Sequence, residues 1–402
     1  MDQGWHRSQW LFALFAAVYW LGGMHFFMQN AGGSGFSLQF NMVGWLFASL
    51  MIGVGLWHIT LTTQLVFSRP QLWLWLGLAL MLIPLLTHGD VPVDIGVPRF
   101  IGLAGGLLLL FALSQLQLSR QQRFAFLYLL LGAVLVEALF ALVQYYLLGY
   151  GNWIGYNYVI NRPYGIFQKD SVLSSFMALG ATIALFLLLV DVASRRGVRL
   201  ALNCAVVFFA GLLLVVIQSR SGQIGLLLSS TILFVLLFKH QQKYAWLAIS
   251  LLVCGLASGV VSYLWLSHGR GLDSYIATID FRLVYWRHCL DLFFEHPLFG
   301  VGYGMFERSF VDSYYAIPAT ISGKSLIEAN LDHPHNEILY WMVEGGIVAL
   351  FGLVIMLAGW GYMLFRAPRP ERLALFALPL PLFFHAMVEY PFYHSTAHWL
   401  AL

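Results

Sequence analysis

The residue best suited to chemistry is His335, which stands near the end of a long polar segment, residues 267–337. Asn336 and Glu337 follow it directly, where an apolar stretch begins. An imidazole, whose unperturbed pKa is about 6.5, can take a proton from an incoming hydroxyl group or orient that hydroxyl. The sequence therefore predicts a group that activates a hydroxyl acceptor, with a purely structural histidine as the alternative.

Two arginines are suited to holding a negatively charged partner. Arg220 lies in a short polar break between two apolar stretches, and Arg282 opens the segment 282–294. A guanidinium grips phosphate oxygens through two parallel hydrogen bonds. Next to Arg220, small residues also allow backbone amides to join at a helix start. Both arginines are predicted to bind phosphate, although Arg220 could instead anchor the chain to lipid headgroups.

The segment 282–294 has the spacing of an amphipathic helix that lies on a membrane surface. Its predicted apolar face consists of positions 283, 286, 290, 293 and 294, with Arg287 on the solvated edge and Cys289 as a packed thiol. The glycine-rich string at 300–304 follows and predicts a sharp turn. This string lacks the strand and helix context of a nucleotide site.

A second polar stretch, residues 161–171, is predicted to be an outer loop. Arg162, Tyr164, Gln168 and Lys169 give it cations and an aromatic turn suited to a polyprenyl phosphate or a sugar, and an ordinary connecting loop is the alternative. Glu389 is predicted to place a carboxylate near the same surface. Glu137 is an ionisable group inside an apolar stretch, for which the sequence indicates no partner.

A metal centre is considered because several histidines are predicted at the outer surface. His394 and His398 stand four residues apart, but neither is part of a motif of two histidines with a carboxylate base. The chain also contains no Asp-x-Asp pair to hold a magnesium-bound nucleotide sugar. We therefore predict no metal ion and no cofactor.

The elements that must carry these residues are membrane helices. The chain of 402 residues is 60% hydrophobic and only 10% charged, whereas about a quarter of the residues of soluble domains are charged. The net charge of +3 is spread over many loops and indicates no nucleic-acid partner. The predicted fold class is an all-α polytopic membrane protein with about 11–12 spans and one large outer loop containing amphipathic helices. Eleven apolar stretches are long enough to span: 10–28, 42–60, 71–88, 100–118, 124–148, 171–190, 200–217, 222–238, 244–266, 338–365 and 373–390.

The distribution of basic residues predicts the orientation, because lysine and arginine are retained on the cytoplasmic side. Twelve of them fall in one set of alternate loops and four in the short loops of the other set. The amino terminus is therefore predicted to be cytoplasmic, with the 267–337 segment outside. We expect four parts: N-terminal helices (1–150), core helices with the outer loop 149–170 and Arg220 (151–266), the large outer loop (267–337) and C-terminal helices (338–402).

Several of these motifs, in this order, resemble the O-antigen ligase superfamily. They are Ser-Arg-Ser-Gly at 219–222, the motif 282–286, the string 296–304, Pro-His-Asn-Glu at 334–337 and Glu-Gly-Gly at 344–346. Within that group, the stretches 162–168 and 389–393 resemble bacterial O-oligosaccharyltransferases of the PglL type, which glycosylate exported proteins. That branch usually has an asparagine two positions after the glutamine, where this chain has Asp170.

The resemblance implies a GT-C-like O-antigen ligase fold in the bacterial inner membrane, with a periplasmic active site. It implies transfer of a preassembled glycan from undecaprenyl pyrophosphate, without metal or nucleotide. His335 would activate the acceptor hydroxyl, and Arg220 and Arg282 would hold the pyrophosphate in the same outer cavity. The implied substrate contacts are Arg162, Tyr164, Gln168, Lys169, Tyr285, Asn336 and Glu389.

The acceptor stays open at this point. It could be a serine or threonine of an exported protein such as a pilin, a lipid A core sugar, or another lipid-linked repeat, as in a polymerase. A transporter of lipid-linked glycans is a less favoured alternative, because transporters place their polar groups near the bilayer midplane. Here most polar groups are predicted at the outer surface.

Overall fold

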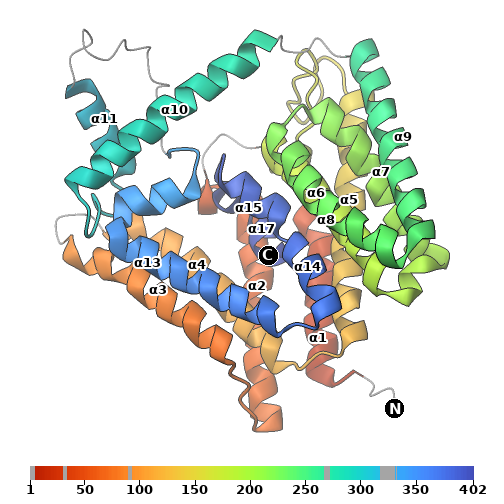
Figure 1. The fold of residues 1–402 in the computed structure, drawn as a ribbon, viewed down its shortest axis with the longest axis horizontal. Helices are drawn as coiled ribbons and strands as arrows, with labels where there is room; N and C mark the ends of the chain where they lie inside the picture. The colour runs from red at the N-terminus through yellow and green to blue at the C-terminus, as the bar shows by residue number, and fades with distance from the viewer. Residues whose placement is uncertain (1–4, 30–33, 89–92, 267–271, 317–330, 332) are drawn as a thin grey trace.

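The fold is all-α, as predicted. The computed structural model describes residues 5–29, 34–88, 93–266, 272–316, 331 and 333–402. Every long regular element in these residues is a helix (Figure 1). Nine described helices are long and apolar enough to cross a membrane. They are α2 (Gln39–Thr62), α3 (Arg69–Thr87), α4 (Val93–Gln115), α5 (Arg120–Leu147), α6 (Asp170–Val190), α7 (Gly197–Ile217), α8 (Arg220–His240), α9 (Gln242–Leu266) and α13 (Glu337–Arg366).

The remaining described helices are shorter or lie in the polar segments. They are α1 (Arg7–Leu21), α10 (Leu272–Glu295), α11 (Phe306–Ala316), α14 (Arg369–Ala377), α15 (Leu380–Ala386), α16 (Pro391–His394) and α17 (Thr396–Ala401). Short 3₁₀ turns stand at η1 (Gly23–His25), η2 (Gly35–Ser37), η3 (Gly165–Phe167) and η4 (Val192–Arg195). Parts of the predicted outer loop, residues 267–271 and 317–330, lie outside the described residues.

Two of the eleven predicted spans differ in the structure. The helix at the first position, α1, has 15 residues, and about 20 are needed to cross a hydrocarbon core. The span predicted over 373–390 is divided into α14 and α15. Pro379 and Pro381 stand at the break, and a proline lacks the N–H that a continuous helix would use. This part of the chain is therefore not one spanning helix.

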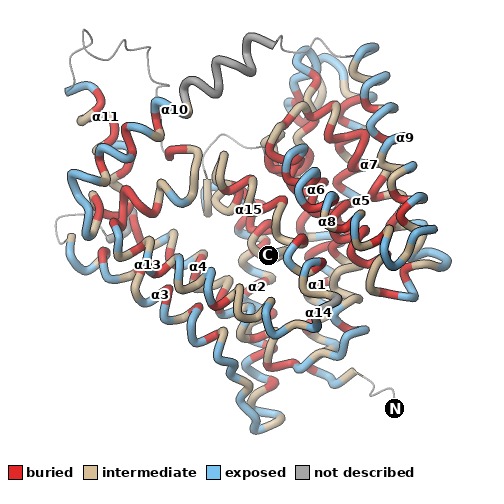
Figure 2. The backbone as a smooth tube through the Cα atoms, in the orientation of Figure 1, coloured by how far each residue is buried: buried red, intermediate tan, exposed pale blue. Residues whose placement is uncertain are grey.

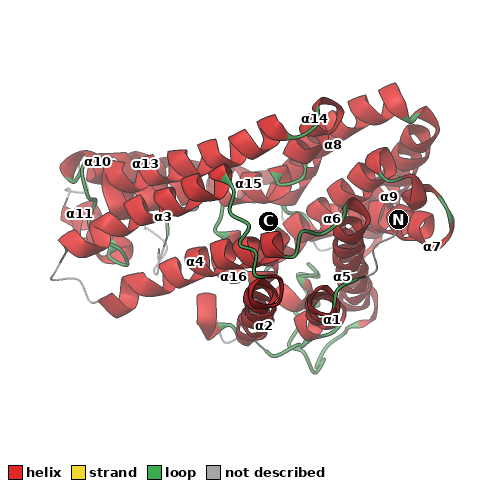
Figure 3. Cartoon of the chain, turned by 90° about the horizontal axis from the view of Figure 1, so that it is seen from below, coloured by secondary structure: helices red, strands yellow, loops and turns green. Residues whose placement is uncertain are grey.

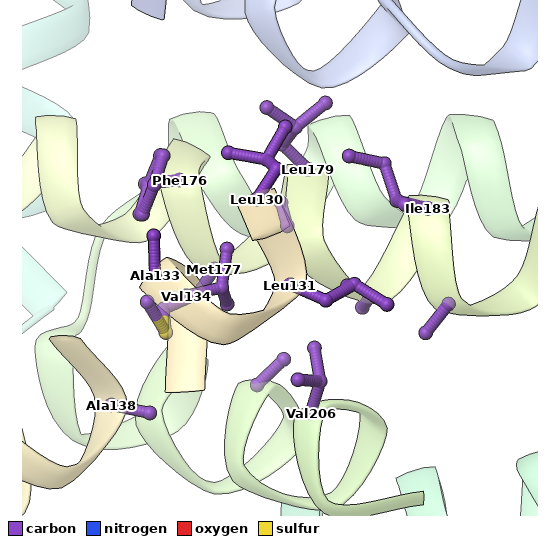
Figure 4. Packing of buried hydrophobic residues seen from close by; sticks show 14 of the residues in the cluster. Leu130, Leu131, Ala133, Val134, Ala138, Phe176, Met177, Leu179, Ile183 and Val206 are labelled. Atoms are coloured by element: carbon purple, nitrogen blue, oxygen red, sulfur yellow. The ribbon is translucent and has the colours of Figure 1, made fainter. Parts of the chain in front are cut away.

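Helix α6 is the centre of one group of helices. Its residues from Ser171 to Leu188 are all buried, and the neighbouring helices α5, α7 and α8 surround it (Figure 1). Figure 4 shows apolar side chains of α5 and α6 in contact at this centre, with Val206 of α7 beside them. A helix that is apolar all round is expected to be buried on all sides.

A second group packs around α13, which runs along α3 and near α4 (Figures 1 and 3). Helices α10 and α11 lie at the amino-terminal end of α13, and the short helices α14–α17 lie between the two groups. The outer faces of the bundle carry large exposed apolar side chains, such as Trp246, Val253 and Val260 of α9 (Figure 2). Such faces suit contact with lipid.

The predicted helix over 282–294 is present within α10, and a second face that was not predicted is buried against the protein. Tyr285, Cys289 and Leu292 are buried against α11 and α13, whereas Leu283 and Leu290 of the predicted face are exposed. As predicted, Arg287 is exposed and Cys289 is a packed thiol; burial raises its pKa. One apolar side of the helix thus faces the protein, and another apolar side is exposed.

The glycine-rich turn interlocks with a kink in α13. Gly346 has φ +64° and ψ −160°, a conformation essentially restricted to glycine, so the helix is interrupted there. Val301 N donates to the Val343 carbonyl oxygen at 2.9 Å, and Ile347 N donates to that of Pro297 at 2.9 Å. The glycines therefore serve close backbone packing, which fixes residues 297–302 to the helix that follows His335.

Candidate active site

The candidate active site is built around the carboxylate of Glu389, in the turn between α15 and α16. Arg282 Nη2 donates to Glu389 Oε1 at 2.9 Å. On the other side of the carboxylate, His335 Nδ1 lies 3.2 Å from Oε2 and His333 Nε2 lies 3.9 Å from it. Three residues predicted from the sequence, Arg282, His335 and Glu389, are thus brought together from parts of the chain that are distant in sequence.

Asn336 fixes the position of His335. Its Oδ1 accepts a hydrogen bond from Leu339 N and caps α13, while its Nδ2 donates to the Met387 carbonyl oxygen at 3.1 Å, two residues before Glu389. Trp286 of α10 donates to the Pro334 carbonyl oxygen at 3.0 Å. These bonds join the segment before α13 to the other two parts of the site.

The backbone of His335 itself is unusual. Its φ of +54° lies in the left-handed region, which costs a residue other than glycine about 1–3 kcal/mol. The bonds made by its neighbours hold this conformation, which directs the imidazole to the carboxylate. Strain retained at one residue in a polar site is typical of a functional position.

The electrostatics favour an ionised Glu389. Burial alone would raise the pKa of its carboxyl, but the interactions with His333 and His335 and the positive charge of Lys169 hold that pKa well below its usual range. The side chains remain partly open, since Arg282, His335 and Glu389 are 22%, 18% and 13% exposed. A solute at this surface can therefore meet a cation, an imidazole and the carboxylate that lies between them.

This arrangement can deprotonate a hydroxyl group and neutralise an anion in the same place. A carboxylate beside an imidazole holds the ring in one orientation and stabilises the imidazolium that forms on proton uptake. A guanidinium has five N–H donors, and one of those of Arg282 is used on Glu389. The other donors suit a phosphate oxygen.

His333, His335 and Glu389 are also the described residues whose donor atoms could hold a metal ion. Their ligand atoms lie within 4.8 Å of one another, and two imidazoles with a carboxylate are a common zinc set. The carboxylate is already bound to Arg282 through its other oxygen. A divalent cation here would have to share the carboxylate with a guanidinium, and it would occupy the imidazole that proton transfer needs.

Two predicted arginines, Arg162 and Arg220, lie near the end of α7 and the starts of α6 and α8. Arg220 is the first residue of α8, and Ser174 Oγ of α6 donates to the Ser219 carbonyl oxygen just before it, at 3.4 Å. Arg162 Nε donates to the Ile217 carbonyl oxygen at 2.9 Å, and its Nη2 lies 2.6 Å from Asp170 Oδ2. Arg162 therefore ties the end of α7 to the start of α6, and Asp170, where the PglL branch has asparagine, is its ion partner.

The other predicted substrate residues have different surroundings. Lys169 precedes α6, and its charge acts on Glu389. Tyr164 is half-buried beside Tyr156, and Gln168 Nε2 donates to the Met28 carbonyl oxygen at 2.6 Å. Tyr285 is 2% exposed and packs in the apolar cluster of α10, α11 and α13.

A buried polar hub beside the site was not predicted. Arg99 of α4 pairs with Glu344, stacks 3.7 Å from the Tyr340 ring centroid, and donates through Nε to Tyr393 Oη at 2.7 Å. Tyr393 Oη in turn donates to Glu337 Oε1 at 3.3 Å. An arginine directly before the apolar stretch 100–118 was the available signal, because a charge so close to hydrocarbon needs a partner.

Comparison with known proteins relates part of the chain to a family. Residues 204–354 match the family model of the O-antigen ligases. The matched region runs from α7 into α13 and contains Arg220, Arg282 and His335, but not residues 162–169 or Glu389. No curated protein sequence matches the chain. The match supports a relation to the membrane enzymes of the O-antigen ligase and polymerase type, which transfer glycans.

Proposed function

We propose that this protein transfers a preassembled oligosaccharide en bloc from undecaprenyl pyrophosphate to serine or threonine hydroxyls of exported proteins such as pilins. The reaction takes place on the periplasmic face of the bacterial inner membrane, with the amino terminus in the cytoplasm, and it needs neither metal nor nucleotide. The observation that carries the proposal is the convergence of Arg282 and His335 on Glu389, next to a match to glycan-transferring ligases.

In the proposed mechanism His335 takes the proton of the acceptor hydroxyl. The acceptor oxygen forms the new bond to the anomeric carbon while the bond from that carbon to the phosphate oxygen breaks, so the configuration inverts. The electron pair leaves on the pyrophosphate, whose charge Arg220 and Arg282 neutralise, and donors of this kind typically contribute a few kcal/mol each. Glu389 holds His335 in place and stabilises its protonated form.

Two acceptors are supported by different observations. The stretches 162–168 and 389–393 resemble the protein-glycosylating branch, which favours a protein hydroxyl. The matched family model is that of O-antigen ligases, and this favours a lipid A core sugar as the second candidate. Both acceptors present a hydroxyl group, so the same residues would serve either reaction.

The decisive experiment uses purified protein in detergent with an undecaprenyl-pyrophosphate-linked oligosaccharide, EDTA and an exported pilin-like protein. Intact-protein mass is the readout, and a parallel reaction contains lipid A core. We expect a glycan-sized gain on the protein that is lost in His335→Ala and Arg220→Ala. Arg287→Ala, an exposed arginine of α10, is the matched control and should retain transfer. Transfer to lipid A core alone would refute the protein acceptor and leave the ligase reaction.

A further inference from the structure

The short 3₁₀ turn η3, which precedes the site residue Lys169, is bound along its backbone by two buried side chains of α5. Ile166 N donates to Glu137 Oε2 at 3.0 Å. Tyr164 N and Gly165 N donate to Gln144 Oε1 at 3.0 and 2.8 Å, and Gln144 Nε2 donates back to the Gly165 carbonyl oxygen at 3.3 Å. Both α5 side chains are at most 1% exposed.

These contacts are needed because η3 dips below the end of the neighbouring spanning helix. Glu137 is ten residues before the end of α5, which is about 15 Å of helix at 1.5 Å per residue. Irregular backbone at such depth cannot bond to bulk water and must be satisfied by the protein. Glu137 and Gln144 supply the acceptors that a helix or strand would otherwise provide.

His25 completes the arrangement from the 3₁₀ turn η1. Its Nδ1 lies 2.6 Å from Glu137 Oε1 and its Nε2 lies 2.9 Å from the Trp20 carbonyl oxygen. Both ring nitrogens thus face oxygens, and His25 holds Oε1 of the same carboxylate whose Oε2 holds Ile166 N. A carboxyl group inside an apolar span is expensive and is retained where it has such a partner.

We infer that Glu137, with Gln144 and His25, is a positioning residue that sets the conformation of residues 164–169 and so places Lys169 at the donor subsite beside Glu389. Gly165 has φ +61°, and a Cβ there would lie 2.6 Å from Glu137 Oε2, so the turn fits closely against this carboxylate. Gln168 follows in the left-handed region, after which Lys169 precedes α6. The part of the inference that concerns the donor rests on the proposed function.

The test compares Glu137→Gln with Glu137→Ala. Glutamine can accept from Ile166 N and donate to His25 Nδ1, so it keeps both contacts of the Glu137 side chain, whereas alanine removes both. Asn203→Ala is the matched control, because Asn203 is a buried polar residue that bonds to η4 at the other end of α6. The first readout is hydrogen exchange of the peptide containing residues 160–170, and the second is the dependence of glycan transfer on donor concentration.

We expect amide exchange of Ile166 to rise about tenfold or more in Glu137→Ala, as for a buried hydrogen bond left unmade, while Tyr164 and Gly165 keep their bonds to Gln144. The same variant should raise the donor KM about tenfold, with kcat changed less. Glu137→Gln and Asn203→Ala should stay within about threefold of wild type in both readouts. Such a pattern separates positioning from loss of fold, since Asn203→Ala also removes a buried polar group.

Two outcomes overturn the inference. Unchanged exchange in Glu137→Ala would show that the carboxylate does not hold the turn. Faster exchange with an unchanged donor KM would show that the turn does not place the donor subsite. If instead the wild-type protein transfers no glycan to any acceptor, the proposed function fails, while the exchange measurement still decides whether Glu137 holds η3.

Discussion

Glu389→Gln removes one negative charge from the centre of the candidate active site and leaves the size of the side chain unchanged. The amide can still accept a hydrogen bond from Arg282. It can no longer stabilise a positive charge on His335, 3.2 Å away. If His335 takes the acceptor proton, the variant should therefore bind the donor and fail in the chemical step.

The size of the effect follows from this distance. Two unit charges 3.2 Å apart attract by about 5 kcal/mol at an effective dielectric constant of ~20. Because His335 and Glu389 are 18% and 13% exposed, solvent screening reduces this by roughly half, to about 2.5 kcal/mol. That corresponds to a loss in kcat of roughly 10²-fold, at the lower end of the 10²- to 10⁴-fold usual for a whole general base.

The assay is the transfer reaction at saturating acceptor, with the donor concentration varied. We expect kcat to fall about 10²-fold and the donor KM to stay within about threefold of wild type, because Arg282 keeps its position. Glu295→Gln, an exposed acid at the end of α10, should leave both constants unchanged. A folded Glu389→Gln variant with near-normal kcat, or one impaired only in KM, would refute the role given to this carboxylate.

Three further predictions concern the same region. Because the pKa of Glu389 is lowered, the stability that its ionised form contributes is complete above about pH 4.3 and is lost as the pH falls through the lowered pKa. The difference in thermal midpoint between wild type and Glu389→Gln should therefore close on acidification. A difference that does not change with pH would contradict this. EDTA should leave transfer unchanged, whereas added Zn²⁺ should inhibit it reversibly by binding to His333, His335 and Glu389. The inhibition should be weaker in His333→Ala. Loss of activity on chelation that zinc then restores would overturn the metal-free mechanism. Gly346→Ala should destabilise the fold by about 1–3 kcal/mol in thermal unfolding. Gly361→Ala in the same helix should be neutral or stabilising, because a Cβ there meets nothing within 4 Å. Equal thermal midpoints for the two variants would refute the role of the kink.

Hydrophobicity predicted most of the spanning helices, because burial in lipid depends mainly on the length and apolar character of a stretch. It failed over 373–390, where apolar character continues but Pro379 and Pro381 prevent one helix from running through. The prolines were visible in the sequence. What could not be read was that the broken segment lies between the two helix groups and carries Glu389 to their junction.

Periodicity predicted the helix over 282–294 and an apolar face toward a membrane surface, but not the second face, which packs against the protein. A helix at a membrane surface has two apolar neighbours, the protein on one side and the bilayer on the other. Spacing alone does not say which apolar row faces which neighbour, and here Tyr285 and Cys289 face the protein while Leu283 and Leu290 are exposed. The partner of Glu137 was hidden for a similar reason, since His25 belongs to a distant turn.

Arg220, Arg282 and His335 were predicted to share one outer cavity, but the contact of Arg282 and His335 with Glu389 was not predicted. That contact depends on how Glu389 is held. Four residues before it, His385 Nδ1 lies 2.7 Å from Ser175 Oγ in α6, the centre of one helix group. Four residues after it, Tyr393 Oη accepts from Arg99 Nε at 2.7 Å, in the group that contains α13. The carboxylate is thus fixed to both groups, and a shift of one against the other would move it relative to Arg282 and His335. Precise packing between the groups is therefore a condition for the proposed catalysis.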